Sequence, residues 1–326
     1  MSHRHPPCTI LNAILLSALC AVLLAPRSAE AVWIWTPKTG KWINPRYAVK
    51  DTPEAQYKFA QTFVDKKDYN RARLEFKSLL SHFPQSAWAP DAQLAVGQTY
   101  EAESDYYQAF LAYRKVLQTY PSITRVDEIV QREFHIGELF LQGQKRKLFG
   151  SAEILPAQEK SVEVFQAIID DAPYAALGDQ AQFKLGESYR AIGQFDDAKK
   201  AFEQLLERYP NSPLADRTRY EIAVSAKYAA LPAGYDQSAT DQALQEFAKF
   251  KDAYPQSELG VQVDQEVARL RQQRAQHAFE VAQFYEQQRA IESAKIYYQD
   301  VVANYQESPL ATQAQARLQA LGGVAR

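Results

Sequence analysis

The sequence predicts an all-α protein, a solenoid of repeated helical hairpins preceded by a short N-terminal β-hairpin. Two observations carry the helical prediction. A small residue, an aromatic residue and a proline recur five times in the same order and at the same spacing, and each copy follows a second helical stretch. Repetition of this kind is the sequence signature of solenoid folds. Glycine is scarce, at 12 of 326 residues, which argues against a β-rich fold and against an enzyme with glycine-rich loops.

Residues 1–31 are predicted to be a secretory signal that is not part of the fold. A weakly basic start leads into an apolar run of 16 residues from Ile10 to Ala25. That run is shorter than the roughly 20 residues that span a bilayer. Ala29-Glu30-Ala31 then fits the small-x-small rule for signal cleavage. We therefore expect export and cleavage after Ala31, with an uncleaved membrane anchor as the alternative.

Cleavage at this place would remove both cysteines, Cys8 and Cys20. A mature chain without cysteine has no disulfide and no thiol chemistry. Its formal charge would be −3, from 35 basic residues (37 without Arg4 and Arg27) and 38 acidic residues (39 without Glu30). This balance lacks the excess of positive charge that is typical of nucleic-acid binding, so no nucleic-acid partner is expected.

Residues 32–45, VWIWTPKTGKWINP, are predicted to form a β-hairpin with a four-residue turn. The segment holds three of the four tryptophans, Trp33, Trp35 and Trp42. Trp35 would face Trp42 across the strands and Ile34 would pair with Ile43, which leaves both faces apolar. Because an isolated two-stranded hairpin is marginally stable in water, we expect it to be covered. A cap over the first repeat is the favoured arrangement, and docking on a partner or an edge strand is the alternative.

The second helix of each predicted hairpin carries the repeated pattern. An aromatic residue follows the small residue by four positions, an apolar residue by seven and a proline by twelve. Offsets of four and seven lie on one helix face, and proline ends the helix. The small residues are Ala72, Ala109, Ser161, Ala198 and Ala243, the aromatics Phe76, Tyr113, Phe165, Phe202 and Phe247, and the prolines Pro84, Pro121, Pro173, Pro210 and Pro255. A sixth copy has Ala294 and Tyr298, with Gln306 in place of the proline.

With the helix that precedes each copy, these units match the tetratricopeptide pattern. We expect five to six repeats, at about residues 53–86, 90–123, 130–175, 179–212, 216–257 and 275–308, followed by a C-terminal capping helix within a solenoid of residues 53–326. The spacing between the fifth and sixth small residues includes a long helical run, from about Leu259 to Gln288. Insertions interrupt the third repeat at 141–160 and the fifth at 230–240. The basic run Lys145-Arg146-Lys147 in the first insertion is expected to be a solvated loop, with contact to an acidic partner or anionic lipid as the alternative.

The first helices of a tetratricopeptide solenoid line its concave face, where partners bind. We place eight residues on this face: Tyr57, Gln61, Leu94, Gln98, Glu101, Phe183, Glu187 and Arg190. Their mixture of aromatic and polar side chains suits an extended peptide, although each could instead pack against a neighbouring helix. The histidines of the mature chain are isolated from one another, so no metal or cofactor is expected. The repeats leave no room for a catalytic domain, so no enzymatic activity is expected.

Hairpin repeats that end in YP-[NQ]-S, at 209–212 and 254–257, resemble the BamD family. This family is the tetratricopeptide lipoprotein of the outer-membrane β-barrel assembly machine. The similarity covers about residues 53–320 and is strongest at 237–305, where Leu-Arg, Ala-x-His and Val-Ala-x-Phe-Tyr follow in the order usual for the family.

The resemblance implies a non-enzymatic scaffold in the periplasm, peripherally attached to the inner face of the outer membrane. The last repeats would dock a POTRA domain of a BamA-like barrel protein, around Gln283, Arg289, Lys295 and Tyr297. The early repeats would engage unfolded outer-membrane protein clients, near Tyr57, Gln61, Leu94 and Gln98.

The chain departs from the family at its lipid attachment site. Family members carry a lipid on a cysteine after a Leu-x-Gly/Ala box, whereas Cys20 follows the bulky Leu19. This favours cleavage after Ala31 over lipidation, and tryptophans, which prefer membrane interfaces, could tether the protein instead. The alternative function is a general periplasmic tetratricopeptide adaptor in cell-wall synthesis, division or secretion.

Overall fold

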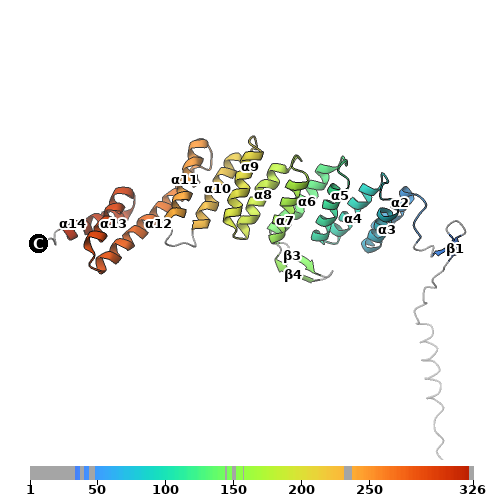
Figure 1. Ribbon diagram of the computed structural model, residues 1–326, viewed down its shortest axis with the longest axis horizontal. Coiled ribbons are helices and arrows are strands. Elements are labelled where there is room, and N and C mark those ends of the chain that lie inside the picture. Colours follow the sequence, from blue (N-terminus) through green and yellow to red (C-terminus); the bar gives the residue numbers. More distant parts are fainter. Residues whose placement is uncertain are drawn as a thin grey trace, which may run out of the picture. The chain divides into compact units, whose positions relative to one another are not determined.

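The computed structural model (Figure 1) describes residues 34–36, 40–43, 48–143, 145–148, 152–156, 158–230 and 237–322. The chain divides into two units, residues 1–52 and residues 53–326. The predicted signal and Trp33 lie outside the described residues.

The first unit contains the predicted tryptophan hairpin. Strands β1 (Ile34–Thr36) and β2 (Lys41–Ile43) are antiparallel, and Trp35 pairs with Trp42 as Ile34 pairs with Ile43. This register confirms the predicted pairing. The side chains of Trp35 and Trp42 are 47% and 64% exposed. The cap over the first repeat stays a prediction.

The second unit is built mainly of helices, and each helix packs against the next along the chain, as Figure 1 shows. The helices are α2 (Pro53–Asp65), α3 (Tyr69–His82), α4 (Ala89–Ala102), α5 (Tyr106–Thr119), α6 (Val126–Leu141), α7 (Gln158–Asp171), α8 (Gly178–Ala191), α9 (Phe195–Arg208), α10 (Ala215–Ala230), α11 (Gln237–Ala253), α12 (Gly260–Gln287), α13 (Ile291–Asn304) and α14 (Pro309–Gly322). The predicted fold class, a tetratricopeptide-type solenoid with a short N-terminal β-hairpin, is confirmed.

A small residue on the first helix of each hairpin faces the aromatic ring of the second helix. A Cβ atom added to Gly186 would lie 2.5 Å from the ring of Phe202, and one added to Gly137 would lie 2.7 Å from Phe165. At Gly97 a Cβ atom would lie closer still to the ring of Tyr113. The six aromatic residues of the repeats are fully buried. The repeated small and aromatic pair is therefore the packing core of each hairpin, because dense interiors leave no space for an added methyl group.

A glutamine also joins the two helices of three repeats. It lies four residues before the small residue, and its Nε2 donates to a backbone carbonyl nineteen residues later, Gln56 to Glu75 at 3.0 Å, Gln93 to Ala112 at 3.1 Å and Gln182 to Ala201 at 2.9 Å. Glu133 takes this position in the third repeat. It is 1% exposed, and neither of its carboxylate oxygens has a hydrogen-bond partner. Burial raises its pKa well above the usual range for a glutamate, with a smaller contribution from Asp171.

The YP-x-S endings form hydrogen bonds around the turns that close the repeats. The Tyr209 hydroxyl donates to the Pro173 carbonyl at 2.8 Å, which joins two successive repeats. The Ser212 hydroxyl donates to Asp179 at the start of α8, at 2.6 Å. Ser257 donates in the same way to Asp216 at the start of α10, at 3.0 Å. The motif that carries the family resemblance therefore has a structural role in this chain.

The insertion in the third repeat differs from the prediction. Residues 145–148 and 152–156 form an antiparallel hairpin, β3 (Lys145–Leu148) and β4 (Ala152–Pro156), in which Lys145 pairs with Pro156. The expectation of a loop was wrong, because Lys145–Leu148 is a strand. The partner strand AEILP contains isoleucine, a β-branched residue that favours strands.

Helix α12 confirms the predicted long helical run and belongs to two parts of the core. Its first half, with Val263 and Leu270, packs with residues of α10 and α11. Its second half, with Ala275 and Phe279, packs with α13 and α14. Among the described residues, no helix combines the length and apolarity needed to cross a bilayer.

Candidate interaction surface

We call the surface formed by α2, α4, α6, α8, α10 and α12 the first-helix face. The structure buries three of its predicted contact residues to different degrees. Leu94 and Phe183 are 1% and 4% exposed, which corrects the expectation that they are accessible. Tyr57 is half-buried between the rings of Phe76 and Trp88, at 5.3 and 5.0 Å. All three lie three residues before a small residue, hence on the same helix side, and that side faces the second helix.

Ion pairs connect α4 with α6, α8 with α10, α10 with α12, and α12 with α14. The first residue of each pair lies four residues after the small residue of its helix. The pairs are Glu101 with Arg132 at 3.0 Å, Arg190 with Glu221, Lys227 with Glu266 at 2.7 Å, and Glu286 with Arg317. Repeats one and three have Val64 and Leu141 there instead. We call these four pairs the ion-pair ladder. Because each pair joins two repeats, the ladder stabilises their stacking more than it offers charge to a partner.

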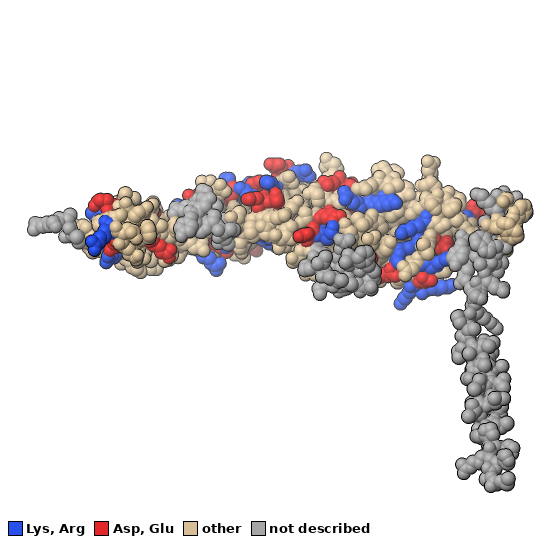
Figure 2. All heavy atoms as spheres, turned by 60° about the horizontal axis from the view of Figure 1, so that its bottom comes forward, with Lys and Arg blue, Asp and Glu red and all other residues tan. Residues whose placement is uncertain are grey.

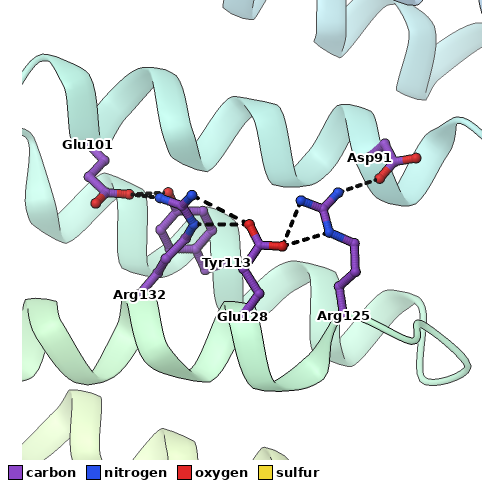
Figure 3. A network of polar contacts seen from close by, with 6 residues as sticks. All are labelled: Asp91, Glu101, Tyr113, Arg125, Glu128 and Arg132. Carbon is purple, nitrogen blue, oxygen red and sulfur yellow. Dashed lines mark hydrogen bonds and ion pairs between the residues drawn. The ribbon is translucent and has the colours of Figure 1, made fainter.

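Around Glu101 the ladder widens into a network of six residues, which Figure 3 shows: Asp91, Glu101, Tyr113, Arg125, Glu128 and Arg132. The Tyr113 hydroxyl and the Arg132 guanidinium both donate to Glu101. Arg125 donates to Glu128 at 2.7 Å and to Asp91 at 2.9 Å, which ties α6 to the start of α4. The hydrogen bond from Arg125 lowers the pKa of Glu128. Burial raises the pKa of the Tyr113 phenol, and its bond to Glu101 raises it further.

The same combination of residues recurs in the last repeat. Glu286 accepts hydrogen bonds from Tyr298, at 2.8 Å, and from Arg317. Tyrosine and arginine follow the glutamate by 12 and 31 residues here, as they do after Glu101. We call each set a Glu–Tyr–Arg triad. Burial and the bond to Glu286 raise the pKa of Tyr298 to about 12.

The fourth repeat has the ladder with its charges exchanged. Arg190 lies at the position of the glutamate, Glu221 takes the place of the arginine, and Phe202 replaces the tyrosine. Burial raises the pKa of Glu221, although Arg190 lies against it. Glu187 is paired as well, with Lys184 at 2.7 Å and Arg217 at 3.7 Å.

The polar residues predicted for the concave face therefore fall into two groups. Glu101, Glu187 and Arg190 are engaged in ion pairs. Gln61 and Gln98 lie half-exposed on α2 and α4. These two glutamines are the predicted residues best placed to meet a ligand on the early repeats.

The four residues predicted for docking surround the last repeat without forming one cluster. Gln283 is exposed on α12 and Arg289 is exposed in the following turn. Lys295 pairs with Glu292 at 2.9 Å and lines a groove between α13 and α14. Tyr297 stacks in parallel on Tyr285, with ring centroids 5.6 Å apart.

Sequence reasoning missed an exposed residue of this region. Phe284 is 56% exposed and its ring meets Tyr285 edge-on at 5.7 Å. We call Phe284, Tyr285 and Tyr297 the last-repeat aromatic patch. The signal lay in the Val-Ala-x-Phe-Tyr motif, whose first aromatic residue does not fall at a core position of the repeat.

Within the described part of the chain, no group of three or more histidine, cysteine, aspartate or glutamate side chains could hold a metal ion. The fold and the paired first-helix face define a tetratricopeptide-type scaffold for protein–protein interaction. The sequence profile of the YfiO family, described as outer membrane lipoprotein, matches residues 49–216 and 158–321. The chain belongs to this family.

No curated protein matches the chain in sequence. Solved structures with similarity include a tetratricopeptide repeat protein from Parabacteroides merdae, 14% identical, covering 82% of this chain and 98% of that one, with a TM-score of 0.34. A thermophilic tetratricopeptide protein of Thermus thermophilus is 16% identical, with coverages of 67% and 98% and a TM-score of 0.30. MamA from Desulfovibrio magneticus is 15% identical, with coverages of 65% and 99% and a TM-score of 0.31.

Proposed function

We propose that this protein is an exported, non-enzymatic scaffold of the machinery that assembles β-barrel proteins in the outer membrane. It would act in the periplasm at the inner face of that membrane and bind a POTRA-type domain of a BamA-like partner. The observation that carries the proposal is the family match, which extends over residues 49–321 and so includes nearly all of the solenoid.

The last-repeat aromatic patch supports the docking part of the proposal. Phe284 exposes more than half of its side chain beside the stacked rings of Tyr285 and Tyr297. Aromatic side chains are enriched among the few residues that carry most of the energy of an interface. Gln283 and Arg289 are exposed near these rings in sequence and would supply polar contacts at the rim.

The early repeats supply the proposed client surface. Gln61 and Gln98 occupy equivalent positions of the first and second repeats, one residue after the small residue. Amide side chains donate and accept hydrogen bonds, so a row of them suits the backbone of an unfolded chain without selecting a sequence. Leu94 would act indirectly, by supporting α4 from the core.

The test is purification of the tagged protein from cell envelopes in mild detergent, with identification of the proteins that accompany it. We expect a POTRA-containing barrel protein with the wild type and its loss with Phe284→Ala. Val261→Ala is the matched control, because Val261 is also exposed on α12 but lies at the other end of that helix. Wall-synthesis or division proteins in place of the barrel protein would overturn the proposal in favour of a general periplasmic adaptor.

A further inference from the structure

A groove opens between the second helices of the first two repeats, α3 and α5, with α4 as its floor. Its volume is about 430 Å³, and its lining includes Lys77, Leu80, Val96, Leu111 and Lys115. We call it the second-helix groove. It is separate from the ion-pair ladder and from the last-repeat aromatic patch, and neither the family match nor the proposed function assigns it a role.

The two lysines of this groove have no carboxylate partner among the described residues. The ion pairs of α3 and α5 are made by Arg71, Arg73 and Arg114. Lys77 and Lys115 are both exposed, and the polar contact of Lys77 is a 3.5 Å approach to the Tyr100 hydroxyl. The groove therefore carries two positive charges that no ion pair among the described residues neutralises.

The neighbouring pair of second helices, α5 and α7, is joined by side-chain contacts that α3 and α5 lack. Between α5 and α7, Arg114 pairs with Asp171 at 2.8 Å. The Tyr107 hydroxyl donates to Glu163 at 3.0 Å in the same contact. The acids that close this contact, Glu163 and Asp171, both belong to α7.

At the equivalent positions between α3 and α5 these acids are absent. Lys77 corresponds to Arg114, while Thr119 stands where α7 has Asp171 and Leu111 stands where it has Glu163. The internal contact that closes α5 onto α7 thus has no counterpart, and a groove with a basic rim remains.

Apolar surface accompanies the charge. Leu74 on α3 and Leu111 on α5 hold the same position of successive repeats and are 60% and 38% exposed. The third, fourth and fifth repeats have Glu163, Lys200 and Gln245 there. Leu74 and Lys77 lie on one side of α3, since residues three apart are neighbours on a helix.

We propose that the second-helix groove binds an acidic peptide segment of a partner protein. One apolar side chain of the segment enters between Leu80, Val96 and Leu111, and its flanking carboxylates pair with Lys77 and Lys115. Two observations identify this occupant. The groove is lined by Lys77 and Lys115, which attract carboxylates. In the neighbouring contact, carboxylates of α7 bind side chains of α5 in the same way. In Figure 2, several basic side chains gather over the N-terminal helices of the second unit, with acidic side chains among them. The hollow form of the site favours a peptide over a lipid surface.

The test is selection of a randomised peptide library, displayed on phage, against the protein purified from expressing cells. We expect enriched sequences with aspartate or glutamate around an apolar residue. Synthetic copies should bind at least about tenfold more weakly to the double variant Lys77→Glu, Lys115→Glu, because attraction becomes repulsion, and binding should weaken with salt. Leu111→Ser should also weaken binding.

The control for charge reversal outside the groove is Lys200→Glu with Lys249→Glu, two exposed lysines of α9 and α11 that pair with Asp197 at 3.2 Å and Glu246 at 2.9 Å. It should bind the selected peptides as the wild type does, and thermal melts should show that all variants fold.

The proposal is overturned by enriched peptides without acidic residues, or by equal binding to the Lys77 and Lys115 double variant. Phosphatidylglycerol vesicles that bind the wild type but not this double variant, with no acidic peptide selected, would assign the groove to lipid and also overturn it. Peptide binding at the groove does not depend on POTRA docking at the last repeat, so Phe284→Ala should leave peptide binding unchanged.

Discussion

The second and the last repeats share one internal framework but present different surfaces. Both have the Glu–Tyr–Arg triad at the same spacing, Glu101 with Tyr113 in one and Glu286 with Tyr298 in the other. Outside the triad, the second repeat borders the basic second-helix groove, whereas the last repeat exposes Phe284. We infer from this difference that the triad stabilises the stacking of repeats, while side chains outside the triad determine what each repeat binds.

The largest effect is expected where the two repeats differ in their small residue, Gly97 in the second and Ala282 in the last. Gly97→Ala would press a methyl group into the buried ring of Tyr113, so we expect a loss of about 3 kcal/mol in the free energy of unfolding. Ala282→Gly should cost about 1 kcal/mol, as glycine does in a helix. Urea unfolding measures both, and an equal loss in the two variants would contradict the packing described for Gly97.

A reciprocal exchange compares the second repeat with the third. Glu133→Gln should restore the hydrogen bond that Gln93 makes, and we expect a gain of about 2 kcal/mol at neutral pH. Gln93→Glu should cost a similar amount. Because the pKa of Glu133 is raised in the folded state, the wild type loses stability as pH rises from the unfolded value of about 4.5 through the folded one. Stability curves against pH that coincide for wild type and Glu133→Gln would refute this account.

A smaller effect is expected from the hydroxyl groups of the two triads. Tyr113→Phe and Tyr298→Phe each remove one hydrogen bond to a glutamate, with an expected loss of about 1 kcal/mol at neutral pH. The pKa of Tyr298 is raised to about 12, above the unfolded value of about 10. Its contribution is therefore complete below pH 10 and is lost as pH rises through 12. Ultraviolet titration of the phenols should show one late-ionising tyrosine fewer in Tyr298→Phe, and an unchanged titration would contradict the assignment.

The smallest effect is expected at the second-helix groove. Lys77→Glu with Lys115→Glu should change the free energy of unfolding by less than about 0.5 kcal/mol, because both side chains are exposed and have no ion pair among the described residues. Thermal melting measures this. A large destabilisation would mean that these lysines support the fold rather than a partner site.

Much of the fold was predictable because the core pattern is local. Small and aromatic residues at helical spacing determine how two adjacent helices pack, and the sequence displays that spacing directly. The misplacement of Leu94 and Phe183 has a geometric cause, since three residues before the small residue a side chain turns toward the second helix. The β3–β4 hairpin was missed because its strands are short and follow no repeat.

The ion-pair ladder was not predicted, although its spacing is written in the sequence. Each pair joins different repeats, so a search within one repeat sees only an isolated charge. A separation of 31 residues between opposite charges, as in Glu101 with Arg132 and Glu286 with Arg317, would have revealed it. The exposure of Phe284 depends on what surrounds it in three dimensions, which periodicity alone does not provide.

The most direct test of the proposed scaffold is binding of the purified protein to the purified POTRA domains of the barrel protein from the same cell, measured by calorimetry. We expect a complex with the wild type, binding at least about tenfold weaker with Phe284→Ala, and unchanged binding with the Lys77 and Lys115 double variant. No binding by the wild type, or equal binding by Phe284→Ala, would contradict the docking role of the last repeat.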